Sequence, residues 1–177
     1  MQTIKAILLS FTLAASTTQA QSCTLHKTDS NNTKTAVKTA PSIEQTFAMI
    51  KPEAVAKGDA GQIISLIEKN GFNIVRMEKR TFTKKQAEDF YTEHKGRPFY
   101  NDLVDYISSG PVIALMLEKE NAITDWRTLL GATDPVQANM GTIRKMFAEN
   151  KSQNAAHGSD SPEAAKRELA FFFKNEN

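Results

Sequence analysis

A short segment near the C-terminal end of the chain holds the residue types best suited to chemistry, Asn154-Ala-Ala-His157-Gly-Ser159-Asp160-Ser161. His157 is one of only three histidines, and the small residues around it leave its imidazole uncrowded. Ser161 and Pro162 suit the N-cap and the first position of a helix. A histidine just ahead of a helix N-terminus lies near free N–H groups and a positive dipole end, which favour anions.

The residue types alone leave three interpretations of His157 open. A serine hydrolase would pair it with Ser159 or Ser161, but triads are assembled from distant segments, and the chain has no Gly-x-Ser-x-Gly motif. A nucleophilic histidine would take a phosphoryl group onto a ring nitrogen. A structural histidine would only cap a turn. No Gly-x-x-x-x-Gly-Lys-Ser/Thr loop is present, so kinase activity would require another phosphate-binding arrangement.

The elements that must position this segment follow from hydrophobic patterning. Apolar runs predict strands at residues 45–51, 72–82 and 112–117, and residues 169–173 are also typical of a strand in composition. Apolar spacing and end signals predict helices at residues 61–70, 83–94, 99–108, 121–130 and 142–149, and from residue 162 onward. The end signals include a capping box at Thr83 and Gln86, a cap at Asn121, and stops at Gly71 and Gly131. Residues 132–141 are expected to form a loop, and the whole pattern predicts a single α+β domain.

Composition excludes several classes of function. The chain has 177 residues, of which 40% are hydrophobic and 24% are charged, as in an ordinary soluble domain. A formal net charge of +2 gives no reason to expect nucleic-acid binding. The single cysteine, Cys23, can form neither an internal disulfide nor a zinc site.

The N-terminus has the layout of an export signal. Lys5 precedes an apolar stretch at residues 6–15, and Thr18-Gln19-Ala20 offers a small-x-small cleavage site. The apolar stretch is too short to span a membrane. We therefore predict a signal peptide at residues 1–20, a polar flexible linker at residues 21–43 and a domain at residues 44–177, with a periplasmic or secreted location. The alternative is a cytoplasmic enzyme with a dispensable N-terminal extension.

The segment around His157 closely resembles the active-site signature of nucleoside diphosphate kinases. Other landmarks of that family follow in its order and spacing: Ile50-Lys51-Pro52, Arg97-Pro98-Phe99, Ser109-Gly110-Pro111, Leu130-Gly131-Ala132-Thr133 and Gly141-Thr142-Ile143-Arg144. Together the motifs cover roughly residues 44 to 174, a far more specific signal than one short pattern. The resemblance implies a ferredoxin-like four-stranded antiparallel sheet with packed helices. It also implies a homo-oligomer, with a homotetramer favoured over a homohexamer because the chain ends soon after Phe173.

The resemblance also implies a reaction and its catalytic residues. His157 would form a pros-phosphohistidine while transferring the γ-phosphate of a nucleoside triphosphate to a nucleoside diphosphate in a ping-pong cycle. Ser159 and Glu168 would orient the imidazole, and Tyr91 would lie nearby. The alternative from another class is a catalytically idle nucleotide-binding or regulatory module on the same fold.

Further residues would bind the nucleotide by the same resemblance. Phe99 would stack on the base beside Leu103, an arrangement that discriminates little between bases. The phosphates and the sugar would be contacted by Lys51, Arg127, Thr133, Arg144 and Asn154. Mg²⁺ would be carried by the nucleotide phosphates, with no protein metal site. Asp134 stands where the family usually has asparagine, and its charge is expected to weaken nucleotide affinity slightly.

Overall fold

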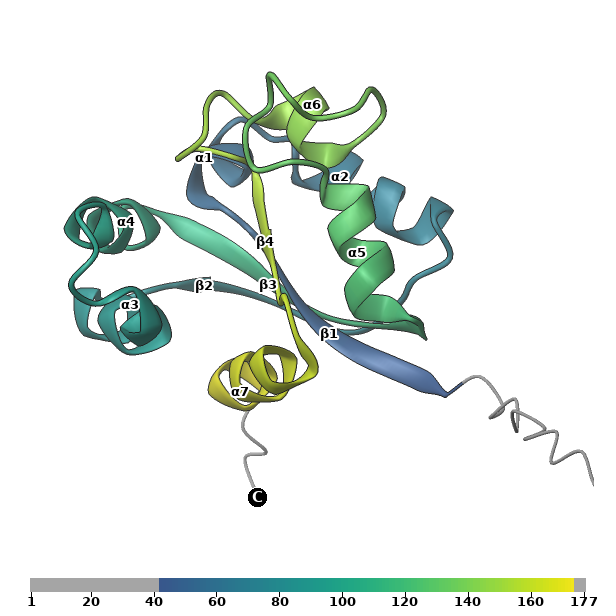
Figure 1. Cartoon of the computed structure of the whole chain (residues 1–177), viewed down its shortest axis with the longest axis horizontal. Coiled ribbons are helices and arrows are strands. Elements are labelled where there is room, and N and C mark those ends of the chain that lie inside the picture. The colour runs from purple at the N-terminus through teal and green to yellow at the C-terminus, as the bar shows by residue number, and fades with distance from the viewer. Residues whose placement is uncertain (1–41, 174–177) are drawn as a thin grey trace, which may run out of the picture. The chain divides into compact units, whose positions relative to one another are not determined.

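A four-stranded antiparallel sheet organises the part of the chain that the computed structural model describes, residues 42–173. The strands lie in the order β2-β3-β1-β4 (Figure 1). Their bounds are β1 Ile43–Ile50, β2 Asn73–Thr81, β3 Pro111–Glu120 and β4 Ala156–Gly158. The predicted α+β class with a four-stranded antiparallel sheet is confirmed. The predicted signal peptide and almost all of the predicted linker lie outside the described residues, although Ile43 already belongs to β1.

The central strand β1 is fixed in register by both of its neighbours. Phe47 lies opposite Met116 of β3, and Met49 lies opposite His157 of β4. The last five residues of β1, Thr46–Ile50, are all buried, as expected for a strand with both faces covered. The candidate nucleophile therefore lies on a strand paired directly with the most buried element of the sheet.

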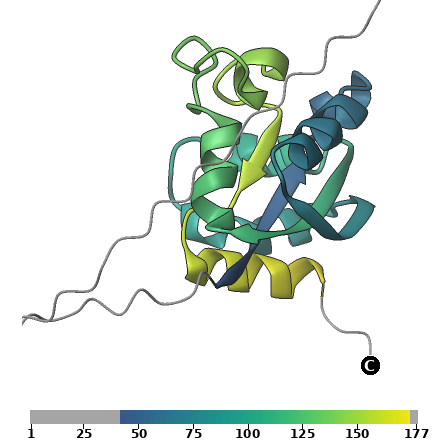
Figure 2. The ribbon, with the colours of Figure 1, turned by 90° about the vertical axis from the view of Figure 1, so that its right-hand side faces the viewer.

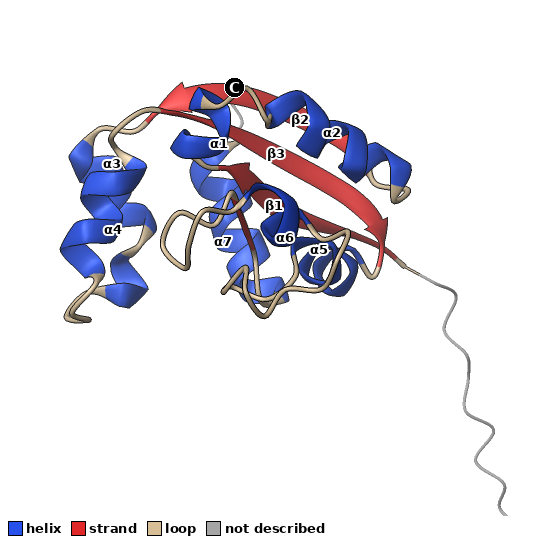
Figure 3. Ribbon diagram, turned by 90° about the horizontal axis from the view of Figure 1, so that it is seen from above, coloured by secondary structure: helices blue, strands red, loops and turns tan. Residues whose placement is uncertain are grey.

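Helices cover both faces of the sheet, and the parity of the strand residues decides which face each side chain meets. One face of β1, with Ala48 and Ile50, packs against four helices: α1 Pro52–Ala56, α2 Ala60–Lys69, α5 Ala122–Leu130 and α6 Ile143–Phe147. The other face, with Phe47 and Met49, packs against three: α3 Lys84–Phe90, α4 Tyr100–Ile107 and α7 Pro162–Phe172. Helix α7 packs against β1 and crosses it obliquely in Figure 2, and Figure 3 shows α3 and α4 side by side.

One predicted strand is wrong. Residues 169–172 form the end of α7 and Phe173 follows at its C-cap, because the helix turns Phe172 onto Phe47 of β1, with ring centroids 4.6 Å apart. The fourth strand is instead the three-residue β4, which contains His157. Its small residues and short length show no alternation that a sequence pattern reveals, so no strand was predicted there.

The helix ends are mostly as predicted. The Thr83 capping box is present, and Ser161 caps α7 by accepting a hydrogen bond from the amide of Ala164. Asn121 makes no side-chain cap for α5; the carboxylate of Glu44 accepts the amide of Ile123 at 2.9 Å instead. Helix α1 was not predicted, because its proline had been interpreted only as the end of a strand.

One further predicted helix is interrupted in the structure. The predicted helix at residues 83–94 is divided, with α3 ending at Phe90 and a separate 3-10 turn at Thr92–His94. Among the helices of residues 42–173, none has the length and apolar character needed to cross a membrane.

Candidate active site

His157 is held by a buried carboxylate. Its Nε2 lies 3.1 Å from Oε2 of Glu168 on α7, and the hydroxyl of Ser159 donates to the same oxygen at 2.7 Å. Both partners are buried, with Glu168 3% exposed and Ser159 fully enclosed. Because an ionised carboxylate only accepts hydrogen bonds, Nε2 carries the proton and Nδ1 keeps its lone pair. The arrangement leaves one ring nitrogen available to a reaction partner.

Aromatic rings surround the rest of the imidazole. Phe47, Phe90 and Tyr91 lie with ring centroids 5.9, 5.6 and 6.2 Å from that of His157, whose side chain remains 21% exposed. The hydroxyl of Tyr91 is buried without a hydrogen-bond partner among the described residues. Burial, and secondarily the charge of Glu168, raises the pKa of Tyr91, so that the hydroxyl stays protonated. It is a free donor beside the histidine.

The backbone of β4 is anchored by a tryptophan. Nε1 of Trp126 on α5 donates to the carbonyl oxygen of His157 at 3.2 Å. Gly158 is required next to it, because a Cβ at that position would collide with the indole ring. The strand that carries His157 is thereby pressed against a fully buried side chain.

Lys51 and Asn154 form a second buried pair. Lys51 follows β1 and is 6% exposed, and its Nζ donates to Oδ1 of Asn154 at 2.7 Å. Burial lowers the pKa of Lys51 to about 8, with a further lowering by Arg144 and an opposing contribution from Glu53. A cation desolvated to this degree favours an anionic ligand, because a phosphate would restore the electrostatic stabilisation lost on burial.

Arg144 links the loop after α5 to β4. Its Nη1 donates to the carbonyl of Gly131 at 2.9 Å and its Nη2 to that of Ala156 at 3.3 Å. Its Nε is buried with no partner in the described part of the chain. Burial, followed by repulsion from Arg127, lowers the pKa of Arg144 to about 10. The guanidinium thus lies next to the strand of His157 with donor capacity left over.

The predicted base-binding side is more open. Phe99 precedes α4 and is 51% exposed, while Leu103 is half-buried and packs with the core on the α4 face. His94 was missed by the sequence analysis. It stacks on Tyr91 at 5.9 Å and lies 5.7 Å from Phe99, connecting the two predicted sites. The sequence signal that could have revealed it is its position between Tyr91 and Phe99, two predicted site residues.

The remaining predicted residues lie on α5 and in the loop that follows it. Arg127 lines a cavity of about 580 Å³, together with residues from the loop after α5 and with Asp160. Thr133 is exposed in the same loop. Asp134 turns its carboxylate onto the amide of Val136 at 3.0 Å, so its charge is engaged in a local turn.

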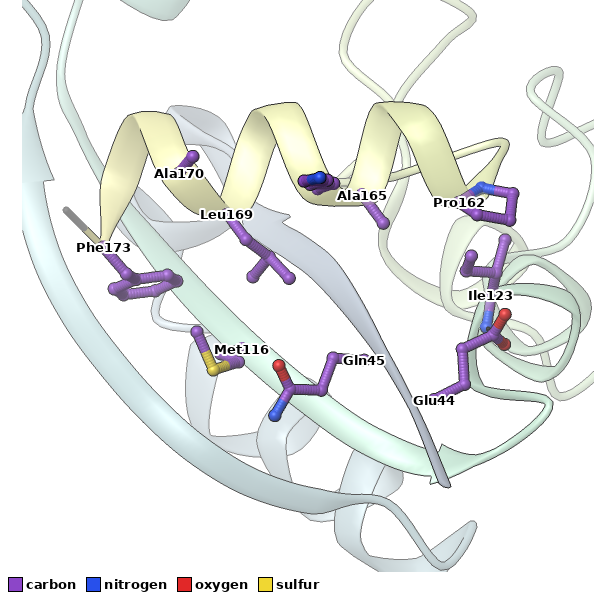
Figure 4. Close-up of a pocket in the computed structure, with 10 residues that line it drawn as sticks. Glu44, Gln45, Met116, Ile123, Pro162, Ala165, Leu169, Ala170 and Phe173 are labelled. Carbon is purple, nitrogen blue, oxygen red and sulfur yellow. Dashed lines mark hydrogen bonds between the residues drawn. The ribbon is translucent and has the colours of Figure 1, made fainter. Parts of the chain in front are cut away.

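A groove lies apart from this site, and the side chains of the described residues also bear on metal binding. A groove of about 370 Å³ runs between α7 and the sheet, lined among others by Met116, Leu169 and Phe173, and it contains none of the predicted site residues (Figure 4). Within residues 42–173, no three His, Cys, Asp or Glu side chains are grouped closely enough to hold a metal ion.

A histidine with one free ring nitrogen, beside a buried lysine and a half-buried arginine, has the composition of a phosphoryl-transfer site. The fold and the site are therefore those expected of a phosphotransferase. Comparison with known proteins specifies the class. The family model described as nucleoside diphosphate kinase matches residues 44–177, and the chain belongs to this family.

Similar proteins agree in name and in extent. The chain is 55% identical over 133 residues to a nucleoside diphosphate kinase of Trichlorobacter lovleyi, covering 75% of this chain and 96% of that protein. It is 56% identical over 131 residues to one from Pelobacter propionicus, covering 74% and 96%. Among solved structures, the Aquifex aeolicus nucleoside diphosphate kinase matches with a TM-score of 0.74 and 40% identity, over 76% of this chain and 97% of that one.

The predictions of family, fold and enzyme class are thus confirmed. The chain is an enzyme that moves a phosphoryl group from a nucleoside triphosphate to a nucleoside diphosphate, and the idle module is not favoured. The roles assigned to individual residues stay predictions, which the geometry above makes specific.

Proposed function

We propose that the transfer proceeds through a phosphohistidine on Nδ1 of His157. The lone pair of Nδ1 attacks the γ-phosphorus of a nucleoside triphosphate, the bond to the bridging oxygen breaks, and the first diphosphate leaves. A terminal oxygen of a second diphosphate then attacks the same phosphorus, and the P–N bond breaks. The observation that carries the proposal is the 3.1 Å contact between Nε2 and Glu168, which stabilises the positive charge on the ring while Nδ1 is bonded to phosphorus.

The phosphates would be bound by two partly desolvated cations. Lys51 donates to Asn154 and Arg144 to Ala156, so both contact the segment that leads to His157, and the charge of each is incompletely solvated. Arg127, Thr133 and Asn154 would add contacts from the rim, in the roles that the family resemblance implies. A nucleoside diphosphate kinase of Halobacterium salinarum, 38% identical with a TM-score of 0.72 over 75% of this chain and 88% of that one, was solved in complex with CDP. That complex supports diphosphate binding on this fold.

The base would stack on Phe99. Half of its surface is open, and Leu103 lies one turn further along α4. A flat aromatic surface accepts any base, because each base has a π-face. We therefore expect broad nucleotide acceptance.

Mg²⁺ is proposed as the cofactor, bound to the nucleotide phosphates. The side chains around the proposed phosphate position are cationic, and the described residues offer no group of three metal-binding side chains. The ion would neutralise phosphate charge, and Lys51, Arg127 and Arg144 would orient the nucleotide that carries it.

A homotetramer is proposed, with a homohexamer as the alternative. Strand β2 lies at the edge of the sheet, and Val75 and Met77 expose 42% and 53% of their surfaces on it. Unpaired strand edges with apolar side chains favour association. Light scattering of the purified enzyme at several concentrations distinguishes four subunits from six and from a monomer.

Export to the periplasm or medium is proposed from the sequence of residues 1–20 alone. N-terminal sequencing of the protein from fractionated native cells tests it. A mature chain starting near Gln21 in the exported fraction supports it, whereas an intact Met1 in the cytosol contradicts it.

Labelling tests the phosphohistidine. The wild-type enzyme incubated with γ-labelled ATP should gain one phosphate per chain that is lost in acid and stable in base. His157→Ala should gain none and lose transfer activity, while its thermal unfolding remains cooperative. An acid-stable phosphate, or activity in the variant, would contradict the mechanism.

A further inference from the structure

The segment between Asn154 and His157 contains an unfavourable turn. Ala155 has a φ of 67°, a left-handed conformation that its Cβ disfavours. The amide of Ala156 closes the turn by donating to the carbonyl of Asn154 at 2.8 Å. In the described residues, only Asn121 shares this property among the non-glycine residues. Such a conformation persists only when its surroundings hold it.

Both peptide groups of Ala155 are held by one distant segment. The amide of Ala155 donates to Oε1 of Glu53 at 2.8 Å, and its carbonyl accepts the amide of Lys51 at 2.9 Å. Glu53 lies in the first turn of α1, 102 residues away in sequence. The turn is thus clamped to the start of α1 on both sides.

The second oxygen of Glu53 is also used. It accepts the hydroxyl of Tyr106 from α4, and the tyrosine ring lies 5.7 Å from Nζ of Lys51. Burial and the neighbouring carboxylate raise the pKa of Tyr106, so the hydroxyl remains a donor. Each oxygen of Glu53 therefore has one fixed partner, and the carboxylate is itself fixed in orientation.

We propose that Glu53, fixed by Tyr106, is a positioning residue for phosphoryl transfer. It holds the left-handed turn at Ala155 and so sets where His157 lies relative to Lys51. The inference rests on the proposed function, because it concerns the placement of His157 as the attacking group. Glu53 itself has no role in binding the transferred phosphate.

The test compares Glu53→Ala, Glu53→Gln and Tyr106→Phe in the full-length enzyme. Single-turnover labelling by ATP gives the rate of His157 phosphorylation, and steady-state assays give kcat and KM. Glu53→Ala should slow labelling by roughly 10- to 100-fold with KM changed much less, because small misplacement of a reacting group has effects of this size. Glu53→Gln keeps an oxygen for the Ala155 amide and should recover most of the rate.

Tyr106→Phe keeps the ring and removes the donor to Glu53, so we expect a smaller fall, up to about tenfold. Glu68→Ala is the matched control, since this carboxylate is exposed on α2, away from the turn at Ala155. Melting curves show whether each variant is folded at the assay temperature. If Glu53→Ala does not fold, the glutamine and phenylalanine variants decide the matter.

The outcomes separate the two proposals. A labelled wild type with an equally fast, folded Glu53→Ala overturns the positioning role alone. Glu53→Gln as slow as Glu53→Ala also overturns it, because charge rather than the hydrogen bond would then be responsible. An unlabelled wild type overturns the phosphohistidine, and the positioning role with it.

Discussion

The histidine cluster and the base-facing side of the site are built in opposite ways. At the cluster, Ser159 and Glu168 are enclosed, and Nε2 of His157 and the hydroxyl of Ser159 share one carboxylate oxygen of Glu168. At the other side, Phe99 is half exposed, and the ring of His94 lies between it and Tyr91 of the cluster. The first region is immobilised by packing and hydrogen bonds, and the second is an open surface.

The two regions match two different requirements of the reaction, transfer of the phosphoryl group and acceptance of the nucleotide base. Transfer of a phosphoryl group needs an attacking atom and cations in fixed places, which a buried and hydrogen-bonded region provides. Acceptance of different bases needs a surface without fixed donors and acceptors, which an exposed ring provides. If this division is real, changes at the cluster should alter kcat and changes at the base side should alter KM.

The largest effect is expected from Arg144→Ala. Loss of a cation next to the transferred phosphate should lower kcat about 100-fold, because its charge matters most in the transition state. Steady-state kinetics with diphosphate binding measured separately check the split. Arg80→Ala, an exposed arginine on β2, is the control. An Arg144→Ala enzyme with normal kcat would contradict the expectation that changes at the histidine cluster alter kcat.

Glu168→Gln should have the next largest effect. The amide keeps the size of the carboxylate but loses the charge that stabilises the ring during transfer, so kcat should fall roughly 30-fold. Rapid-quench labelling should show the fall in the phosphorylation step. Unchanged labelling would mean that the Nε2 contact only fixes the orientation of His157.

Activity should also fall at alkaline pH. Lys51, with its pKa lowered to about 8, is charged below that pH and neutral above it. Since kcat/KM reports the free enzyme, it should fall about tenfold per pH unit once Lys51 is deprotonated. Lys51→Arg keeps its charge and should move the fall to higher pH, even if its activity is lower throughout. A wild-type profile that is flat up to pH 10 would contradict this role.

The smallest effect is expected at the base side. Phe99→Ala should raise KM roughly fivefold with kcat nearly unchanged, since loss of one exposed stacking surface is worth about 1 kcal/mol. The rise should be similar for purine and pyrimidine diphosphates. A large, base-specific fall in kcat would show that the two regions are not separate.

Features that depend on residues close together in the sequence were predicted, and features that depend on distant residues were not. Long apolar runs such as β3 and the spaced residues of α2 were located, because their periodicity is local. The landmarks that carry His157 and Lys51 were located because each motif is contiguous. The contact from Glu53 to Ala155 spans 102 residues, and the cap that Glu44 provides to Ile123 spans 79, so no local pattern reveals either.

Two local signals were misleading for a related reason. The aromatic run ending at Phe173 has the composition of a strand, but its packing against Phe47 favours a helix. The strand of His157 has only three residues, two of them small, and it forms because β1 offers a free edge to pair with. In both cases tertiary contacts, rather than intrinsic preference, decide the local structure.

The bond between Trp126 and the carbonyl of His157 has a practical consequence. Trp126 is the only tryptophan of the chain. All indole fluorescence therefore comes from a ring that is hydrogen-bonded to the backbone carbonyl of His157. In the proposed mechanism a phosphoryl group on His157 would bring negative charge close to this fluorophore and should shift its emission. The enzyme therefore carries an intrinsic optical probe, and stopped-flow fluorescence can follow each half of the catalytic cycle without a label.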